Sequence, residues 1–356
     1  MTTHTLLQLG WHALRTSQFA IYADAGLVPG RVSRPERGGA VVATETGSVT
    51  AGLHLEGLAA EQLALPTVGD WVALRRPDDG STPTVTAVLP RTSAFLRHAA
   101  GNETVAQALA ANIDIVFVVV PLNRALNLTR IERFLTLAWE SGATPVLVLS
   151  KADVCDDLPV AVELASSAAP GVDVIAVSAV AGRGLSDVIA HVSAGVTVAL
   201  LGQSGAGKST LVNAMAGEEL MATHDIRADG RGRHTTTHRE LVVLPAGGIL
   251  IDTPGLRTVL LWDAEAGLER AFDDVEEYAA QCRFHDCRHA SEPGCAVTAA
   301  VLADLLPQRR VDSHRKLLRE LEFLAGKQDK RVAAEQRRKT KVMFKSYRQR
   351  DQLRPR

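Results

Sequence analysis

The pattern of apolar and polar positions changes near residue 112. Before it, short apolar stretches alternate with turn residues, which is typical of short β-strands. We predict strands at Ala40–Thr44, Gly52–Leu55, Asp70–Arg75 and Thr84–Leu89. Several short strands within about 60 residues favour a small barrel of the OB type, although a β-sandwich fits the pattern equally well.

After residue 112 the apolar runs become nearly continuous, as in strands buried on both faces of a parallel sheet. The runs are Ile113–Val120, Pro145–Leu149, Val172–Val177, Val196–Leu201 and Ile249–Ile251. Thr129–Glu140 has helical spacing, and so does Val311–Leu324 near the C-terminus. Strands that alternate with helices predict a doubly wound α/β domain.

The overall charge balance hides two regions of opposite charge. The 356 residues carry a formal net charge of −1 and are 46% hydrophobic, enough to form substantial cores. Residues 308–356, however, hold 17 Lys and Arg against 6 Asp and Glu, which leaves 22 against 34 in the rest. The basic end, with Phe344 and Tyr347 interspersed, favours RNA binding, with a solvated charged helix as the alternative.

Membrane insertion and secretion are not expected. The longest apolar run, Ile115–Leu122, is far shorter than the roughly 20 residues that span a bilayer, and residues 1–19 show no secretory signal. Three of the four cysteines lie within 14 residues, which favours a metal site in a reducing compartment. We expect a cytoplasmic protein with no membrane partner.

A phosphate-binding loop is the strongest chemical signal in the sequence. The residues that fit GxxxxGK[ST] are Gly202, Gln203, Ser204, Gly205, Ala206, Gly207, Lys208 and Ser209, followed by Thr210. An apolar strand precedes the motif and a helical pattern follows it, as the mechanism requires. Backbone N–H groups would face the phosphates, Lys208 would reach the β- and γ-phosphates, and Ser209 would bind Mg²⁺.

Two further motifs complete a nucleotide site. Asp252, at the end of an apolar run, can hold Mg²⁺ from the other side, and Gly255 can offer an N–H to the γ-phosphate. Ser150-Lys151-Ala152-Asp153 is similar to the [NT]KxD signature that reads guanine, with Ser150 where Asn or Thr is usual. Ser178-Ala179 matches the weaker element that contacts guanine O6. These motifs precede the phosphate loop, so the order is circularly permuted.

The spacing Cys282-x₄-Cys287-x-His289-x₅-Cys295 offers three thiolates and an imidazole. This set suits a structural, tetrahedral Zn²⁺ site, and a cluster of reduced thiols without metal is the alternative. His285 competes with His289 for the fourth position.

With these motifs, the chain closely resembles the ribosome small-subunit-dependent GTPase A family (RsgA, also called YjeQ). The resemblance spans nearly the whole chain. It is carried by the permuted motif order, the Cys/His cluster, and the segments Gly69–Val72, Ala110–Asp114 and Gly232–Thr237. It implies an OB fold, His289 as the fourth zinc ligand, GTP hydrolysis stimulated by the 30S subunit, and a role in late 30S maturation.

Catalysis requires an oriented water near the γ-phosphate. Many GTPases place Gln directly after DxxG, whereas Leu256 stands there in this chain. His234 is our candidate for the catalytic group, together with Lys208, and a solvated loop histidine is the alternative. By resemblance to switch I, one of the threonines 235–237 would complete the Mg²⁺ shell.

We therefore expect a circularly permuted α/β P-loop GTPase domain with an N-terminal OB-type β-barrel and a C-terminal, zinc-binding, mainly helical domain. The predicted segments are an N-terminal extension (1–37), the barrel (38–100), the GTPase domain (101–264), the zinc-binding domain (265–326) and a basic tail (327–356). In the barrel, the arginines that could contact RNA are Arg31, Arg34, Arg75, Arg76, Arg91 and Arg97.

The expected partners are the 30S subunit with its 16S rRNA, and GTP or GDP with Mg²⁺. We expect a monomer with one Zn²⁺. Two other functions remain open: a non-catalytic, nucleotide-dependent RNA-binding factor and a P-loop kinase of small molecules.

Overall fold

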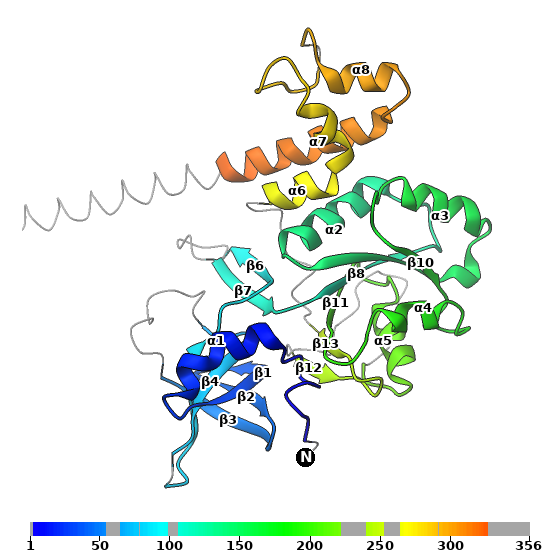
Figure 1. The fold of residues 1–356 in the computed structure, drawn as a ribbon. Coiled ribbons are helices and arrows are strands. Elements are labelled where there is room, and N and C mark those ends of the chain that lie inside the picture. The colour runs from blue at the N-terminus through cyan, green and yellow to red at the C-terminus, as the bar shows by residue number, and fades with distance from the viewer. Residues whose placement is uncertain are drawn as a thin grey trace, which may run out of the picture.

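A computed structural model describes residues 3–54, 65–77, 79–98, 106–221, 240–252, 264–290 and 292–326. Figure 1 shows a small β-barrel, a sheet with helices on both faces, and a group of helices packed on the outer side of α2. Among the described residues, no helix combines the length and the apolar character needed to cross a membrane.

The N-terminal part is a closed five-stranded barrel preceded by helix α1 (Ala13–Ala23). Its strands are β1 (Val28–Glu36), β2 (Gly39–Thr44), β3 (Gly47–Leu53), β4 (Trp71–Arg75) and β5 (Thr84–Val88). They pair in the order β1-β2-β3-β5-β4 and close through β4 and β1, with β3 and β5 parallel. The closed ring confirms the predicted OB-type barrel and excludes the sandwich.

The predicted start of the barrel at residue 38 is wrong. Strand β1 begins at Val28, inside the segment that we assigned to an N-terminal extension. Pro29, Gly30 and Pro35 weaken its strand pattern. Gly30 is needed in the strand because a Cβ at this position would lie 2.4 Å from a Val42 methyl group.

The central sheet has six strands in the order β10-β9-β8-β11-β13-β12. They are β8 (Ile115–Pro121), β9 (Thr144–Ser150), β10 (Val174–Val177), β11 (Thr197–Leu201), β12 (Glu240–Val243) and β13 (Ile249–Asp252). The five predicted runs form the parallel part, and β12 adds an antiparallel edge that we did not predict.

Helices cover both faces of this sheet. One face packs against α2 (Leu128–Glu140) and α3 (Leu158–Ser166), and the other packs against α4 (Leu185–Ala190) and α5 (Lys208–Ala216). The side chains of β8 alternate accordingly, with Val118 on the α2 side and Phe117 on the α5 side. This arrangement confirms the doubly wound α/β fold.

A buried polar joint connects the barrel to the sheet at Asn112. Its side chain accepts from Arg15 Nη2 at 2.8 Å and donates to Gly69 O at 3.0 Å, while its carbonyl accepts from Arg31 Nη2 at 2.9 Å. Gly69 has φ 87°, and a Cβ there would lie 2.1 Å from Ala111 O. Two of the segments that carry the family resemblance therefore meet at this joint, next to the hairpin of β6 (Ala94–His98) and β7 (Ala106–Ala111).

The C-terminal part packs directly onto α2. It contains α6 (Glu265–Ala271), α7 (Asp273–Ala279), α8 (Ala296–Leu302) and a helix over 308–326, which we call the C-terminal helix. One apolar core runs from the sheet through α2 into these helices. The contact is closest at Gly267, where a Cβ would lie 2.3 Å from Thr136 O and whose N–H donates to Glu140 Oε2 at 2.8 Å.

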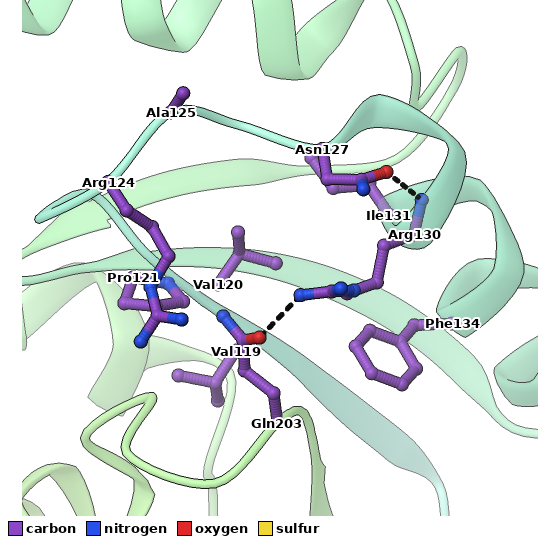
Figure 2. Close-up of a pocket in the computed structure, with 10 residues that line it drawn as sticks. All are labelled: Val119, Val120, Pro121, Arg124, Ala125, Asn127, Arg130, Ile131, Phe134 and Gln203. Atoms are coloured by element: carbon purple, nitrogen blue, oxygen red, sulfur yellow. Dashed lines mark hydrogen bonds between the residues drawn. The ribbon is translucent and has the colours of Figure 1, made fainter. Parts of the chain in front are cut away.

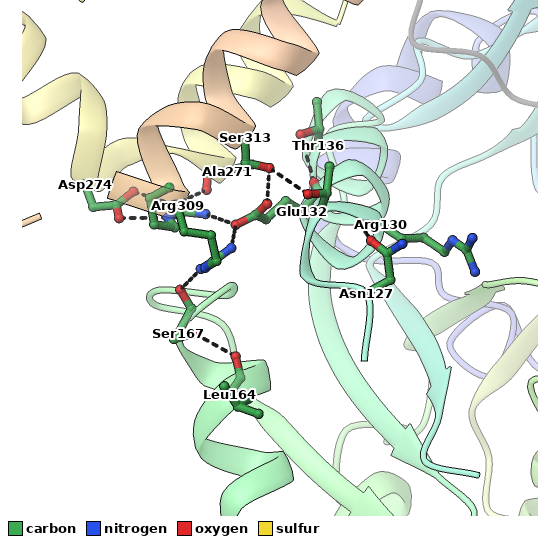
Figure 3. Close-up of polar contacts among 12 residues, drawn as sticks. Asn127, Arg130, Glu132, Thr136, Leu164, Ser167, Ala271, Asp274, Arg309 and Ser313 are labelled. Atoms are coloured by element: carbon green, nitrogen blue, oxygen red, sulfur yellow. Dashed lines mark hydrogen bonds and ion pairs between the residues drawn. The ribbon is translucent and has the colours of Figure 1, made fainter. Parts of the chain in front are cut away.

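Glu132 lies at the centre of this interface (Figure 3). Its side chain is fully buried and accepts hydrogen bonds from Arg309 Nη1 at 2.6 Å, from Arg310 Nη1 at 3.1 Å and from the Ser313 hydroxyl. Arg310 also bonds the carboxylate of Asp274 and the carbonyl of Ala271. Each buried charge thus has a partner, which is the condition under which buried charges are tolerated.

We expect Glu132→Ala to destabilise the protein by about 3–5 kcal/mol, because it removes one of the two carboxylates that neutralise the buried Arg310 guanidinium, together with the partner of Arg309. The matched control is Glu320→Ala. Glu320 forms an ion pair with Arg133 at 2.7 Å, but both side chains are about one-third exposed, so the loss should stay below about 1 kcal/mol. Urea denaturation followed at a probe in the C-terminal helix measures both, and equal losses would contradict the assignment.

Candidate nucleotide and metal sites

The sequence motifs converge at the carboxyl edge of the parallel strands. Residues 118 and 201 are paired between β8 and β11, and Ser150 lies beside both Pro121 and Val177. Pairing of Ala199 with Ile251 brings the end of β13 next to the start of the phosphate loop. Open α/β sheets bind their ligands at this edge.

The phosphate loop has the backbone that its glycines predict. Gly202 leaves β11 at φ 154°, where a Cβ would lie 2.4 Å from Val119 O, and Gly205 and Gly207 have φ values of 73° and 83°. Helix α5 then begins at Lys208, so Ser209 and Thr210 lie in its first turn. Its first N–H groups have no partner within the helix, which makes the turn a favourable place for phosphate oxygens.

Lys208 folds back over the loop. Its Nζ donates to the carbonyls of Gly202 and Gln203, both at 2.8 Å. These two bonds hold the ammonium group above the loop, where it can reach the β- and γ-phosphates of a bound nucleotide.

Ser150 ties the base-reading strand to the phosphate loop. Its buried hydroxyl donates to Ala206 O at 2.6 Å, across 56 residues of chain. The effect of Ser150 on guanine affinity, at a position where Asn or Thr is usual, is a separate question that the sequence leaves open. In this structure the Ser hydroxyl is long enough to reach the loop.

Asp153 and Ser178 lie together at the end of β9 and β10. The Ser178 hydroxyl donates to the exposed Asp153 carboxylate, and this hydrogen bond lowers the pKa of Asp153. The carboxylate is therefore ionised at neutral pH, as needed to accept from guanine N1–H and N2–H₂. Lys151 precedes it in the left-handed conformation at φ 60°, and Ala179 follows Ser178.

The remaining predicted nucleotide residues are only partly described. Asp252 ends β13 at the same edge as the loop. Gly255, His234 and the threonines 235–237 lie outside the described residues, as do Leu256 and the basic tail.

A pocket beside the phosphate loop was missed by sequence reasoning (Figure 2). It lies between the end of β8 and the start of α2, with Phe134 on one wall and Gln203 of the loop on another. Arg130 reaches across it and donates from Nη1 to Gln203 Oε1 at 2.5 Å. No local pattern marks this pair, because 73 residues separate the two side chains.

Two of the six barrel arginines are not available for RNA. Arg31 is 1% exposed and donates to three backbone carbonyls, and burial lowers its pKa to about 10. Arg91 forms a bidentate pair with the fully buried Asp70. The prediction that these two arginines contact RNA is therefore wrong. Of the other four, Arg75, Arg76 and Arg97 are exposed, and the half-buried Arg34 pairs with Glu36.

Three of the four residues in the Cys/His cluster have the separations of a tetrahedral metal site. The ligand atoms of Cys282, Cys287, His289 and Cys295 all lie within 4.8 Å of one another. His289 Nδ1 is 3.6 Å from the sulfurs of Cys282 and Cys295, which are 3.9 Å apart. Tetrahedral Zn²⁺ would set sulfur–sulfur separations of about 3.8 Å and sulfur–nitrogen separations of about 3.6 Å.

The imidazole of the cluster is His289, whereas the exposed His285 takes no part in it. Burial lowers the pKa of His289, which favours the neutral imidazole that ligates metals, and burial raises the pKa of Cys287 to about 11. A metal must therefore displace a thiol proton when it binds. The four residues could hold a metal ion.

The chain is similar to known proteins over nearly its whole length. The family model described as RsgA GTPase matches residues 88–262. A protein of Streptomyces avermitilis named "Small ribosomal subunit biogenesis GTPase RsgA" is 50% identical over 95% of this chain and 91% of its own. "Small ribosomal subunit biogenesis GTPase RsgA 2" of Vibrio parahaemolyticus is 43% identical over 90% and 87%.

This chain belongs to the RsgA GTPase family. It is a GTPase, and GTPases use Mg²⁺ with their nucleotide.

Solved structures agree with this assignment. YjeQ from Thermotoga maritima matches 83% of this RsgA-family chain and 98% of its own, with a TM-score of 0.64 and 26% identity. YloQ, titled a circularly permuted GTPase, has the same fold at a TM-score of 0.61 and 22% identity. The permuted order predicted from the motifs is therefore confirmed.

We expect Ser150→Ala to weaken GTP and GDP binding to similar extents, by about 1–3 kcal/mol. The variant leaves the buried Ala206 carbonyl without its donor and removes the hydrogen bond between the loop and β9. Ser150→Thr keeps the hydroxyl and should bind nearly as well as the parent. Titration calorimetry with both nucleotides measures this, and unchanged affinity in Ser150→Ala would contradict the role assigned to the hydroxyl.

Proposed function

We propose that this GTPase binds the small ribosomal subunit and hydrolyses GTP in a subunit-stimulated manner during late subunit maturation. The observation that carries the proposal is the 50% identity, over 95% of the chain, to a relative named for small-subunit biogenesis. The match includes the barrel and the C-terminal domain as well as the nucleotide site, so the parts that flank the GTPase domain are shared.

The flanking parts offer surfaces for ribosomal RNA. Arg75 and Arg76 are exposed in the barrel, and Arg97 is exposed in the β6–β7 hairpin beside it. The basic tail, 327–356, follows the C-terminal helix along the chain. Neutralisation of phosphates by clustered cations favours RNA at both places. We infer that 16S rRNA is the contacted component, that the protein acts in the cytoplasm, and that it binds as a monomer.

At the nucleotide site we assign the phosphates to the loop 202–209 with Thr210, and the base to Ser150, Lys151, Asp153, Ser178 and Ala179. Lys208 would neutralise charge that develops on the β- and γ-phosphates during hydrolysis. Ser209 and Asp252 would hold Mg²⁺, which supplies further charge neutralisation when bound. Gly255 would offer its N–H to the γ-phosphate.

Leu256 cannot orient the attacking water, so the missing group must come from elsewhere. We propose His234, next to the threonines 235–237 in sequence, as the residue that does so when the subunit is bound. Its imidazole can accept a proton from the attacking water or orient that water by a hydrogen bond.

The decisive experiment measures GTP turnover of the purified protein with and without small subunits. We expect slow turnover alone and a rise of at least about tenfold with subunits, because the partner would complete the catalytic site. Absence of stimulation would contradict the proposal and favour a non-catalytic, nucleotide-dependent RNA-binding factor. A preference for ATP would favour a small-molecule kinase.

His234→Ala should remove most of the stimulated turnover, by about 10²-fold, and leave GTP affinity nearly unchanged, because the imidazole acts in the transition state. His238→Ala, four residues along the same segment, is the matched control and should keep full stimulation. Stimulated turnover in His234→Ala at the parent rate would refute the assignment.

The metal of the Cys/His cluster is, we propose, one structural Zn²⁺ per chain. Three thiolates and one imidazole leave no position for water, and such ligands select zinc. Elemental analysis should find one zinc in the parent and in Cys155→Ser, whose cysteine lies outside the cluster, and none in Cys287→Ser, which should also be less stable because zinc binding contributes to folding. A zinc-free parent protein would contradict this.

A further inference from the structure

Helix α2 contacts the phosphate loop at its first turn. Arg130 Nη1 donates to Gln203 Oε1 at 2.5 Å (Figure 2), and the backbone carbonyl of the same Gln203 accepts from Lys208 Nζ at 2.8 Å. The exposed Arg130 therefore contacts one of the two residues whose carbonyls hold the lysine above the loop, although it lies far from the phosphate motif in sequence.

The loop needs such external support because glycines dominate its backbone. Gly202, Gly205 and Gly207 all have positive φ. Glycine adopts this conformation easily, but it has no side chain that could pack against the rest of the protein and hold the loop in place. Ser150 supports the loop at Ala206 from β9, and Arg130 supports it at Gln203 from α2. The two contacts lie three residues apart in the loop, at Gln203 and at Ala206.

Helix α2 also packs against the sheet and against α3, and its outer side contacts the C-terminal domain. Glu132, two residues after Arg130, accepts from Arg309 and Arg310 of the C-terminal helix (Figure 3). One further turn along, Gly267 of α6 packs against the backbone of Thr136, and the Arg270 guanidinium lies 4.4 Å from the Trp139 ring centroid. A shift of these helices must therefore shift α2, because interfaces packed this closely do not deform continuously.

We propose that Arg130 is a positioning residue for GTP hydrolysis: through Gln203 it sets the part of the phosphate loop that holds Lys208, and the C-terminal domain sets Arg130 through the Glu132 contacts. The inference goes beyond the proposed function, since it requires only GTP turnover and no ribosomal partner. It gives the C-terminal domain a route to the phosphate loop within the described residues.

The test of the first half is steady-state GTP hydrolysis without ribosomal subunits, with active sites counted by nucleotide binding. Arg130→Ala should lower kcat about tenfold and change KM less than about threefold, because the glycine backbone still binds phosphate while Lys208 is less well placed for the transition state. Arg130→Lys keeps a donor and should recover part of the loss.

The control for this variant is Arg133→Ala, on the same helix. Arg133 forms an exposed ion pair with Glu320 and does not contact the loop, so kcat should stay within twofold of the parent. A Gln203→Ala partner completes a double-mutant cycle, and the double variant should be no slower than the slower single variant. Parent-like kcat in Arg130→Ala, or simple additivity in the cycle, would overturn the proposal.

The proposed link between the C-terminal domain and Arg130 is tested with variants in the C-terminal helix. Arg309 is about one-third exposed, donates to Glu132 Oε1 at 2.6 Å and to Ser167 O at 3.0 Å, and can be removed without emptying the core. Arg309→Ala should lower the same kcat about threefold, whereas Arg319→Ala, whose side chain bonds only the Arg315 carbonyl of its own helix among the contacts described, should not.

A parent-like kcat in Arg309→Ala would overturn the link to the C-terminal domain, even where Arg130→Ala is slow. Because all these rates are measured without subunits, a failure of the small-subunit proposal cannot produce either result.

Discussion

The buried carboxylate of Glu132 is the interaction on which the arrangement of this protein depends. A negative charge shielded from water must be neutralised by the protein, and here the cations come from Arg309 and Arg310, some 180 residues further along the chain. Arg310 is itself 1% exposed and needs Asp274 as well. The GTPase sheet, α2 and the C-terminal helices therefore form one continuous core.

The circular permutation places α2, and with it this interface, ahead of the phosphate loop in sequence. The strand that leads to the proposed base-reading residues and the helix that carries Glu132 come before the phosphate loop in sequence. They support the loop in space through Ser150 and Arg130. The C-terminal domain packs on the outer side of α2, so the helix lies between the nucleotide site and that domain (Figure 1). A joint at Asn112 fixes the barrel on the other side.

Much of this was predictable because it depends on local patterns. The runs of β8, β9 and β11 are nearly continuously apolar, since both faces are covered, and the phosphate loop requires a fixed set of glycines and a lysine. Strand β1 was missed because Pro29, Gly30 and Arg31 interrupt its apolar pattern. Arg31 was misassigned because an arginine in sequence gives no sign that three carbonyls surround it.

Other features depend on residues that are distant in sequence. The spacing of the cysteines allowed either His285 or His289 as the fourth ligand; the family resemblance favoured His289, and the folded loop places His289 in the cluster. The partners of Ser150, Arg130 and Glu132 lie 56 to 181 residues away. Such pairs leave no periodicity, so the connection between the nucleotide site and the C-terminal domain became visible only in three dimensions.

The most direct test of the account is the affinity of the protein for small ribosomal subunits in its two nucleotide states. If the nucleotide site and the domains that flank it act as one unit, the protein should bind subunits at least about tenfold more tightly with a non-hydrolysable GTP analogue than with GDP. This corresponds to a difference in binding free energy of about 1.4 kcal/mol. Equal affinities in the two states would contradict the account.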